Sequence, residues 1–168
     1  MLCYRQVKFH DYKNYDNLFL NTLDKISNSD DKLSTNYTID AMENMVEYGY
    51  LIDQQDNIVY MTGIQSFDGL LRIESRTWIN PIYRKRLWNP PDNYDMVIQQ
   101  YNNHKHNSFF FKSRKRSPAG HLRSQKLNKF FNDWILYPKP IELYWKDNIQ
   151  WIMYKGNENE IEKILYKA

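Results

Sequence analysis

The sequence is poor in the residues that would tie it to disulfide, zinc or membrane chemistry. Its one cysteine, Cys3, cannot form an internal disulfide, and the clustered Cys and His ligands of structural zinc sites are missing. It has no run of about 18 apolar residues that could span a bilayer. Its N-terminus carries charges and tyrosines where a secretory signal would be apolar. We therefore expect a chain without membrane contact in a reducing compartment, the cytoplasm.

Sequence motifs for nucleotides and metals are also missing. Neither a Walker-type phosphate loop nor a GxGxxG pattern occurs, so no motif supports nucleotide hydrolysis or dinucleotide redox chemistry. His104 and His106 are too close together, and lack the neighbouring acidic cluster, for a familiar metal site. We predict no bound metal. Without internal repeats or a low-complexity linker, residues 1–168 read as a single domain.

Positive charge is concentrated in the middle of the chain. The formal net charge is +3, yet residues 81–130 hold eleven Lys and Arg against two Asp. An anionic ligand could bind this stretch. The alternative is a solvated basic face that keeps the surface wet.

The first half of the chain predicts two helices followed by strands. Residues 15–26 place Leu18, Leu23 and Ile26 on one helical face, and a second helix is expected from Thr38 to Tyr48. Residues 48–53 and 58–67 flank a Gln-Gln-Asp-Asn tip, which is typical of a β-hairpin.

A third strand is expected over residues 70–79 (LLRIESRTWI). Successive side chains of a strand point to opposite faces of the sheet. One face, expected to be core, carries Leu71, Ile73, Thr77 and Ile79. The other, expected to be functional or wet, carries Arg72, Glu74, Arg76 and Trp78.

The second half alternates helices and strands. We predict a helix over residues 93–104 with Met96, Val97 and Tyr101 inward, and a buried strand over residues 108–113. A helix over residues 121–134, strands at 141–145 and 149–156, and a short helix at 159–167 complete the order. The fold class is α/β (α+β), with a mixed, mostly antiparallel sheet flanked by helices.

Residues 78–86 (WINPIYRKR) resemble a known cofactor-binding segment. In GNAT-type N-acetyltransferases the central strand ends in an apolar-x-Pro-x-Tyr-Arg run and enters the cofactor loop. With the element order, the likeness extends over residues 18–156. It implies that residues 70–79 and 108–113 form a central parallel pair that splays to admit the pantetheine arm of acetyl-CoA. Trp78, Ile79, Phe111 and Ser113 would line that opening.

The cofactor loop differs from the family pattern. The family has Arg/Gln-x-x-Gly-x-Gly/Ala there, because backbone N–H groups must approach the CoA pyrophosphate closely. Counted from Arg86, Asn89 and Pro91 stand at the glycine positions. Cations could hold a phosphate through their side chains instead. The cofactor-binding candidates of this loop are Arg84, Lys85, Arg86, Leu87 and Trp88.

An alternative reading of the same loop needs no ligand. Tyr83 and Trp88 would pack as a cap over the strand end, and the basic side chains would point to water.

The resemblance also implies catalytic roles. A carboxylate deprotonates the acceptor amine, and Glu74 is the candidate, since partial burial would raise its pKa. The alternative is an ion pair with Arg72 or Arg76. The helix that carries the family's tyrosine acid has none here, which leaves His121 as the candidate acid. Ser113 could offer its hydroxyl to a pantetheine-like amide.

The resemblance implies a divergent acyltransferase that moves an acyl group from acetyl-CoA, or another acyl-CoA, to a small-molecule or peptide amine. Two alternatives stay open. One is an inactive GNAT-like interaction protein. The other is a nucleic-acid-binding module that uses the basic residues 112–126 and stacks bases on Trp88 and Tyr101.

Overall fold

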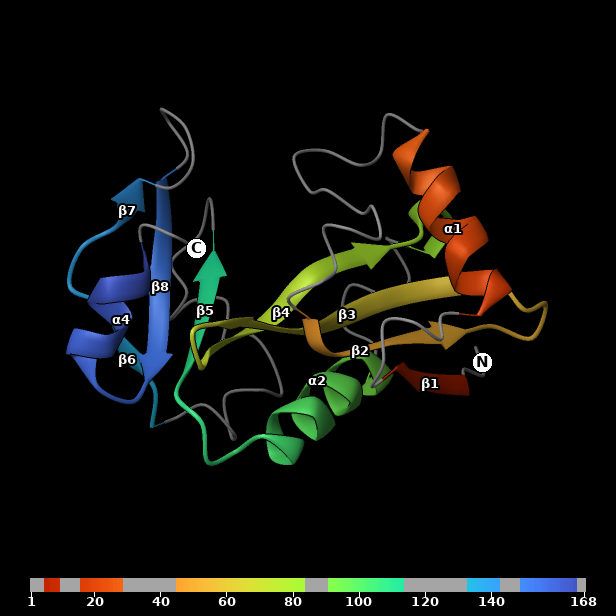
Figure 1. The fold of residues 1–168 in the computed structure, drawn as a ribbon. Coiled ribbons are helices and arrows are strands. Elements are labelled where there is room, and N and C mark those ends of the chain that lie inside the picture. The colour runs from red at the N-terminus through yellow and green to blue at the C-terminus, as the bar shows by residue number, and fades with distance from the viewer. Residues whose placement is uncertain are drawn as a thin grey trace. The chain divides into compact units, whose positions relative to one another are not determined.

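The computed structural model describes residues 5–9, 16–28, 45–83, 91–113, 133–142 and 149–165 (Figure 1). The chain divides into two compact units. The first comprises Met1–Gln65 and Glu74–Gln100, and the second comprises Ser66–Ile73 and Tyr101–Ala168. The expectation of a single domain stays a prediction.

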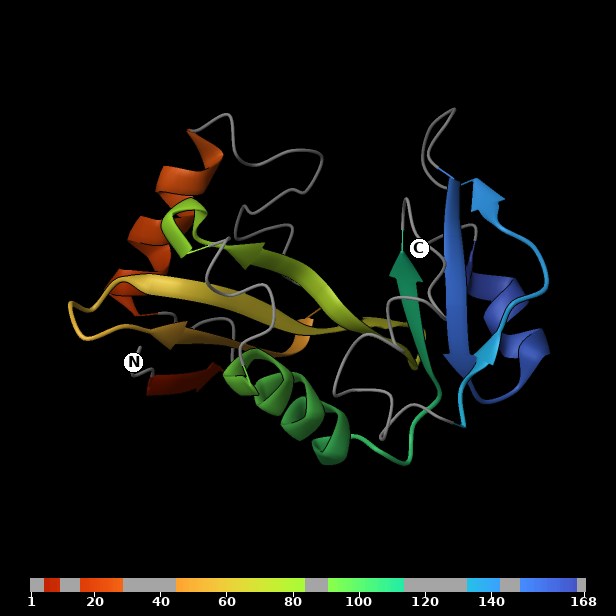
Figure 2. The same ribbon diagram turned by 180° about the vertical axis from the view of Figure 1, so that it is seen from behind.

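The first unit is an antiparallel sheet with a helix on each face. Its strands are β1 (Arg5–Phe9), β2 (Met45–Ile52), β3 (Ile58–Phe67) and the later part of β4 (Leu70–Ile79), hydrogen-bonded in that order. Helix α1 (Asn17–Ser27) covers one face and α2 (Pro91–Asn103) covers the other, as Figures 1 and 2 show. A short 3-10 helix, η4 (Pro81–Tyr83), follows β4.

Helix α1 is fixed to the sheet at its first turn. Asp16 is the N-cap, and its carboxylate accepts a hydrogen bond from the Phe19 N–H at 2.8 Å. The Tyr50 hydroxyl donates to the same carboxylate. The Phe19 ring lies parallel to the Tyr50 ring and edge-on to Tyr48, with centroids 6.0 and 5.6 Å away. A cap and a buried aromatic group therefore set where α1 packs.

Helix α2 is joined to the opposite face. Met96 packs with Leu51 and Tyr60, and the fully buried Gln100 donates from Nε2 to the Thr62 carbonyl oxygen at 3.1 Å. The predicted inward residues Met96, Val97 and Tyr101 are all buried.

The second unit contains the parallel strand pair. The start of β4 runs parallel to β5 (Phe109–Ser113), with Leu71 opposite Phe109 and Arg72 opposite Phe110. Strand β5 is antiparallel to β8 (Ile149–Lys155), which also pairs with β6 (Ile135–Leu136) and β7 (Ile141–Glu142). Helix α4 (Glu158–Leu165) follows β8. The predicted mixed, mostly antiparallel sheet with one parallel pair is confirmed.

Aromatic rings fill the core of the second unit. Tyr101, Phe109 and Trp134 pack with centroids 5.1 to 6.1 Å apart. The Lys155 ammonium donates to the Tyr101 hydroxyl at 2.9 Å and to the Lys105 carbonyl oxygen at 2.8 Å. Because Tyr101 is 7% exposed and packed in this cluster, the expectation that it stacks on nucleic-acid bases is wrong.

Two local predictions were wrong, and strands β1 and β6 were not predicted. The predicted helix over residues 38–48 is wrong in its last four residues, because strand β2 begins at Met45. Nearly all of β2 is buried, so its sequence lacks the alternation of polar and apolar residues that is typical of a half-exposed strand. Strand β1 was not predicted, since its five residues carry little pattern. Trp134 is buried as expected but lies outside a helix. Residues 121–132 of that predicted helix, and residues 38–44 of the earlier one, lie outside the described residues.

Replacing Gly63 by alanine should destabilise the first unit. The new Cβ would lie 2.3 Å from Tyr48 Cδ2 and 2.4 Å from the Glu47 carbonyl oxygen, and the backbone oxygen cannot move aside cheaply. We expect the free energy of unfolding to fall by about 3 kcal/mol, measured by urea titration. Gly69→Ala is the control: its Cβ meets nothing within 4 Å, so only the backbone conformation at φ +91° is penalised, by about 1 kcal/mol. Equal losses in the two variants would contradict the packing argument.

Candidate functional site

The central feature of the candidate site is a kink within strand β4. Glu74 and Arg76 have φ angles of 53° and 55°, in the left-handed region. Residues with a Cβ rarely adopt this conformation, which costs on the order of 1–3 kcal/mol each. Such strain persists only where the surrounding structure holds it in place.

Three side chains hold the kink. The Thr77 hydroxyl donates to the Glu74 carbonyl oxygen at 2.9 Å, and the Tyr48 hydroxyl donates to the Arg76 carbonyl oxygen at 2.6 Å. Between them, the Ser75 hydroxyl donates to Gln65 Oε1 at 2.7 Å. Thr77 Oγ1 also lies 2.7 Å from Thr62 Oγ1 on β3, in a further hydrogen bond. The kink is therefore bonded to the neighbouring strand β3 and, through Tyr48, to β2, the next strand along the sheet.

The kink shifts the alternation of β4 and corrects the predicted faces. Ser75 bonds to Gln65, which lies opposite Met45 in the sheet, and Met45 belongs to the same core cluster as Trp78. Ser75 and Trp78 thus share a face, although residues three apart in a regular strand lie on opposite faces. The prediction that Trp78 shares a polar face with Glu74 is wrong: Trp78 is 9% exposed and packs against α1.

Glu74, the candidate general base, is half-buried within the kink. The hydrogen bond from the Thr77 hydroxyl to the Glu74 carbonyl oxygen restricts the backbone conformation of Glu74. The Glu74 carboxylate therefore projects from a backbone segment that has few other conformations. The partial burial expected from the sequence is confirmed. Its proposed role as a base stays a prediction.

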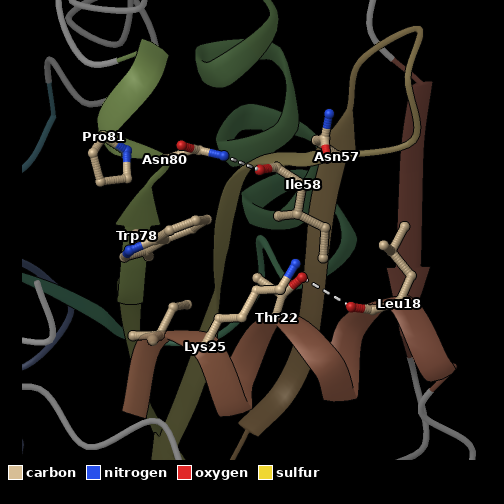
Figure 3. Close-up of a pocket in the computed structure, with 9 residues that line it drawn as sticks. Leu18, Thr22, Lys25, Asn57, Ile58, Trp78, Asn80 and Pro81 are labelled. Carbon is tan, nitrogen blue, oxygen red and sulfur yellow. Dashed lines mark hydrogen bonds between the residues drawn. The ribbon is translucent and has the colours of Figure 1, made fainter. Parts of the chain in front are cut away.

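The end of β4 borders a pocket in the first unit, which we call the α1 pocket (Figure 3). Its volume is about 260 Å³. It is lined by Leu18, Thr22, Lys25, Ile26, Asn57, Ile58, Trp78, Asn80 and Pro81. Asn80 fixes this end of the strand, because its Nδ2 donates to the Ile58 carbonyl oxygen at 3.0 Å and its Oδ1 accepts from the Ile82 N–H at 3.1 Å.

The structure tests the other predicted site residues only in part. Ile79 packs against Leu51, Tyr60 and Met96, on the face of the sheet opposite to Trp78. Ser113 ends β5, but its side chain lies outside the described residues. The remaining candidates, also outside them, are Arg84, Lys85, Arg86, Leu87, Trp88 and His121.

Sequence reasoning missed Tyr48 and Lys25. Tyr48 lies 28 residues from Arg76 along the chain, so no local pattern could link its hydroxyl to the kink. Lys25 lies in α1, and the periodicity of that helix predicted only which apolar residues face the core.

Two further findings concern the described residues only. The described residues contain no group of three or more His, Cys, Asp or Glu arranged to hold a metal ion. In the same part of the chain, no helix is long and apolar enough to cross a membrane.

The fold is that of GNAT-type N-acetyltransferases. No protein-family model and no curated protein sequence matches the chain. An acyl-CoA N-acyltransferase from Pseudomonas aeruginosa superposes with a TM-score of 0.56 at 7% identity, over 92% of this chain and 100% of that one. Ard1 from Thermoplasma volcanium superposes with a TM-score of 0.54 at 10% identity, over 90% of this chain and 96% of that one. The ribosomal-protein-S18-alanine N-acetyltransferase from Escherichia coli superposes with a TM-score of 0.53 at 8% identity, over 92% of this chain and 98% of that one.

Thr77→Val should loosen the kink. It keeps the branched shape but removes the hydroxyl that bonds to the Glu74 carbonyl oxygen and to the Thr62 hydroxyl. We expect a loss of about 1–2 kcal/mol in the free energy of unfolding, measured by urea titration. The control is Thr22→Val, which removes only a hydroxyl bonded to the Leu18 carbonyl oxygen one helical turn earlier, and should change stability by less than about 0.5 kcal/mol. Similar losses in both would argue against a special role for Thr77.

Proposed function

We propose that this chain is a divergent cytoplasmic acyltransferase that moves an acyl group from acetyl-CoA or another acyl-CoA to an amine. The observation that carries the proposal is the held kink in β4, which presents the half-buried carboxylate of Glu74 from the central strand of a GNAT-like fold. Strained backbone that several side chains hold in place is concentrated at functional sites.

The residues that follow β4 fit an anionic cofactor by their chemistry. Asn80 fixes the strand end and η4, and the three cations Arg84, Lys85 and Arg86 come directly after η4 in the sequence. Guanidinium and ammonium groups bind phosphate through charge-assisted hydrogen bonds. In the proposal these three side chains hold the CoA phosphates in place of the glycine-loop amides. Acyl-CoA, when bound, supplies the acyl group as an activated thioester.

Glu74 has the chemistry of the general base in this proposal. An ammonium group is a poor nucleophile until it loses a proton, and a carboxylate within hydrogen-bond reach can accept that proton. His121 is the proposed acid for the leaving thiolate, and Ser113 the proposed partner of a pantetheine amide. Ile79, Leu87 and Trp88 complete the proposed cofactor contacts.

The acceptor is proposed to be a small-molecule or peptide amine. Among the similar structures, the Escherichia coli enzyme is named for an alanine of a ribosomal protein, which is a peptide acceptor. The burial of Tyr101 removes one of the aromatic groups that the nucleic-acid alternative required.

Glu74→Gln should separate catalysis from binding. The amide keeps the size and hydrogen-bonding capacity of the side chain but cannot accept the proton, so kcat should fall by about 10²-fold or more. The measurement is CoA thiol release with a panel of small amines and peptides, and the affinity for acetyl-CoA should stay unchanged. Glu160→Gln, on the exposed side of α4, is the matched control and should keep full activity. Full activity of Glu74→Gln across the pH range would exclude Glu74 as the base.

Acetyl-CoA binding should be weak and strongly salt-dependent, because side-chain charges replace backbone donors. We expect calorimetry to show binding at low ionic strength that Arg86→Glu abolishes and that Lys163→Glu, a charge reversal on α4, leaves intact. No heat at millimolar acetyl-CoA with folded protein would favour the inactive interaction protein. Tight, salt-independent binding would show that the loop uses other contacts. Binding of single-stranded nucleic acid that Arg86→Glu weakens, without any CoA binding, would favour the nucleic-acid module.

A further inference from the structure

We propose that the α1 pocket is a binding site for a small carboxylate with a flat apolar body. The site lies within the first unit and involves one of its helices and the ends of two of its strands (Figure 3). It goes beyond the proposed acyl transfer and does not require CoA.

The walls of the α1 pocket suit a flat apolar group. Ile26 on α1 and Ile58 on β3 are each 2% exposed, and the Trp78 ring reaches into the space from β4. Leu18 closes the side nearer the start of α1. Small-molecule sites are concave, mostly apolar and furnished with a few polar groups that orient the ligand. A volume of about 260 Å³ holds a molecule the size of an aromatic amino acid or smaller.

The polar groups of the α1 pocket select for negative charge. Of the described residues that line it, Lys25 alone is charged, and Figure 3 shows its side chain rising from α1 into the space below the strand ends. Among the described residues, no hydrogen bond or ion pair engages the Lys25 ammonium or the Asn57 side-chain amide. Both can donate to a carboxylate. The Lys25 ammonium favours an anion over a neutral ligand.

Other polar groups in or near the α1 pocket are already engaged. Asn80 uses both ends of its amide, and the Thr22 hydroxyl donates to the Leu18 carbonyl oxygen at 2.8 Å, leaving its oxygen only as an acceptor. Two acidic residues lie at this end of the hairpin. Asp56 is exposed, whereas Asp53 is 7% exposed and accepts from the Gln55 and Asn57 N–H groups, both at 2.9 Å. The charge of Asp53 is therefore partly compensated by backbone donors, and none of the described residues that line the pocket carries a carboxylate.

This charge pattern also argues against an amine in the same place. An acceptor amine is positively charged before it reacts, and the Lys25 ammonium would repel it. The α1 pocket is therefore not the amine site of the proposed acyl transfer, and a failure of either proposal leaves the other standing.

The test uses three probes of similar shape and different charge: phenylacetate, phenylacetamide and phenethylamine. Each is titrated into the ¹⁵N-labelled full chain while amide chemical shifts are followed by NMR. We expect saturable shifts at Thr22, Lys25, Asn57 and Asn80, with phenylacetate roughly 3- to 10-fold tighter than phenylacetamide and phenethylamine weakest. Lys25→Met should reduce the preference for phenylacetate over phenylacetamide to about one, and Lys25→Arg should restore it. Lys163→Met, a matched loss of charge on α4, should change neither affinity.

Several outcomes would overturn the proposal. They are an absence of saturable shifts at the pocket residues with any probe, tighter binding of phenethylamine than of phenylacetate, and a carboxylate preference that survives in Lys25→Met. Acetyl-CoA is then added to the phenylacetate-saturated protein. Unchanged shifts support a separate site, whereas displacement of phenylacetate from Trp78 and its neighbours would make the pocket part of the cofactor site.

Discussion

The left-handed backbone at Glu74 and Arg76 is the constraint on which the first unit depends. Two such residues within one strand are unfavourable, and hydrogen bonds from Tyr48 and Thr77 to the kinked carbonyl groups compensate for this. Tyr48 is itself positioned by the Phe19 ring of α1 and by the close approach of Gly63. Helix position, glycine placement and strand geometry are thus parts of one arrangement. Disturbing any of them should change where Glu74 projects.

The same kink decides what lies on each face of β4. By shifting the alternation it turns Trp78 toward α1, where its ring packs in the core and borders the α1 pocket, while Ile79 packs toward α2. A regular strand would have sent Ser75 and Trp78 to opposite faces. One irregularity therefore both presents a carboxylate and supplies an aromatic wall for a separate small-molecule site. The two proposals share this structural origin, but their charge requirements differ.

Much of the fold could be predicted because its signals are local. The bounds of β4, the tip of the hairpin before it and the inward residues of α2 follow from periodicity and turn residues within short windows. Prediction failed where burial removed the pattern or where a strand was too short to show one, as at Met45 and in β1. It also failed for Trp78, because a strand was assumed to alternate without interruption.

The sequence by itself determined the fold class, the bounds of β4 and the choice of Glu74 as the candidate base, since these depend on residue type and spacing along the chain. Only the tertiary structure decided which hydroxyl groups hold the kink, which way Trp78 faces and which residues gather around Lys25. The Tyr48 hydroxyl bonds to Arg76 across 28 residues, and Lys25 lines the same pocket as Asn57 and Trp78 only because α1 packs over the sheet. Contacts of this kind arise when the sheet pairs and the helix docks, and no local pattern encodes them.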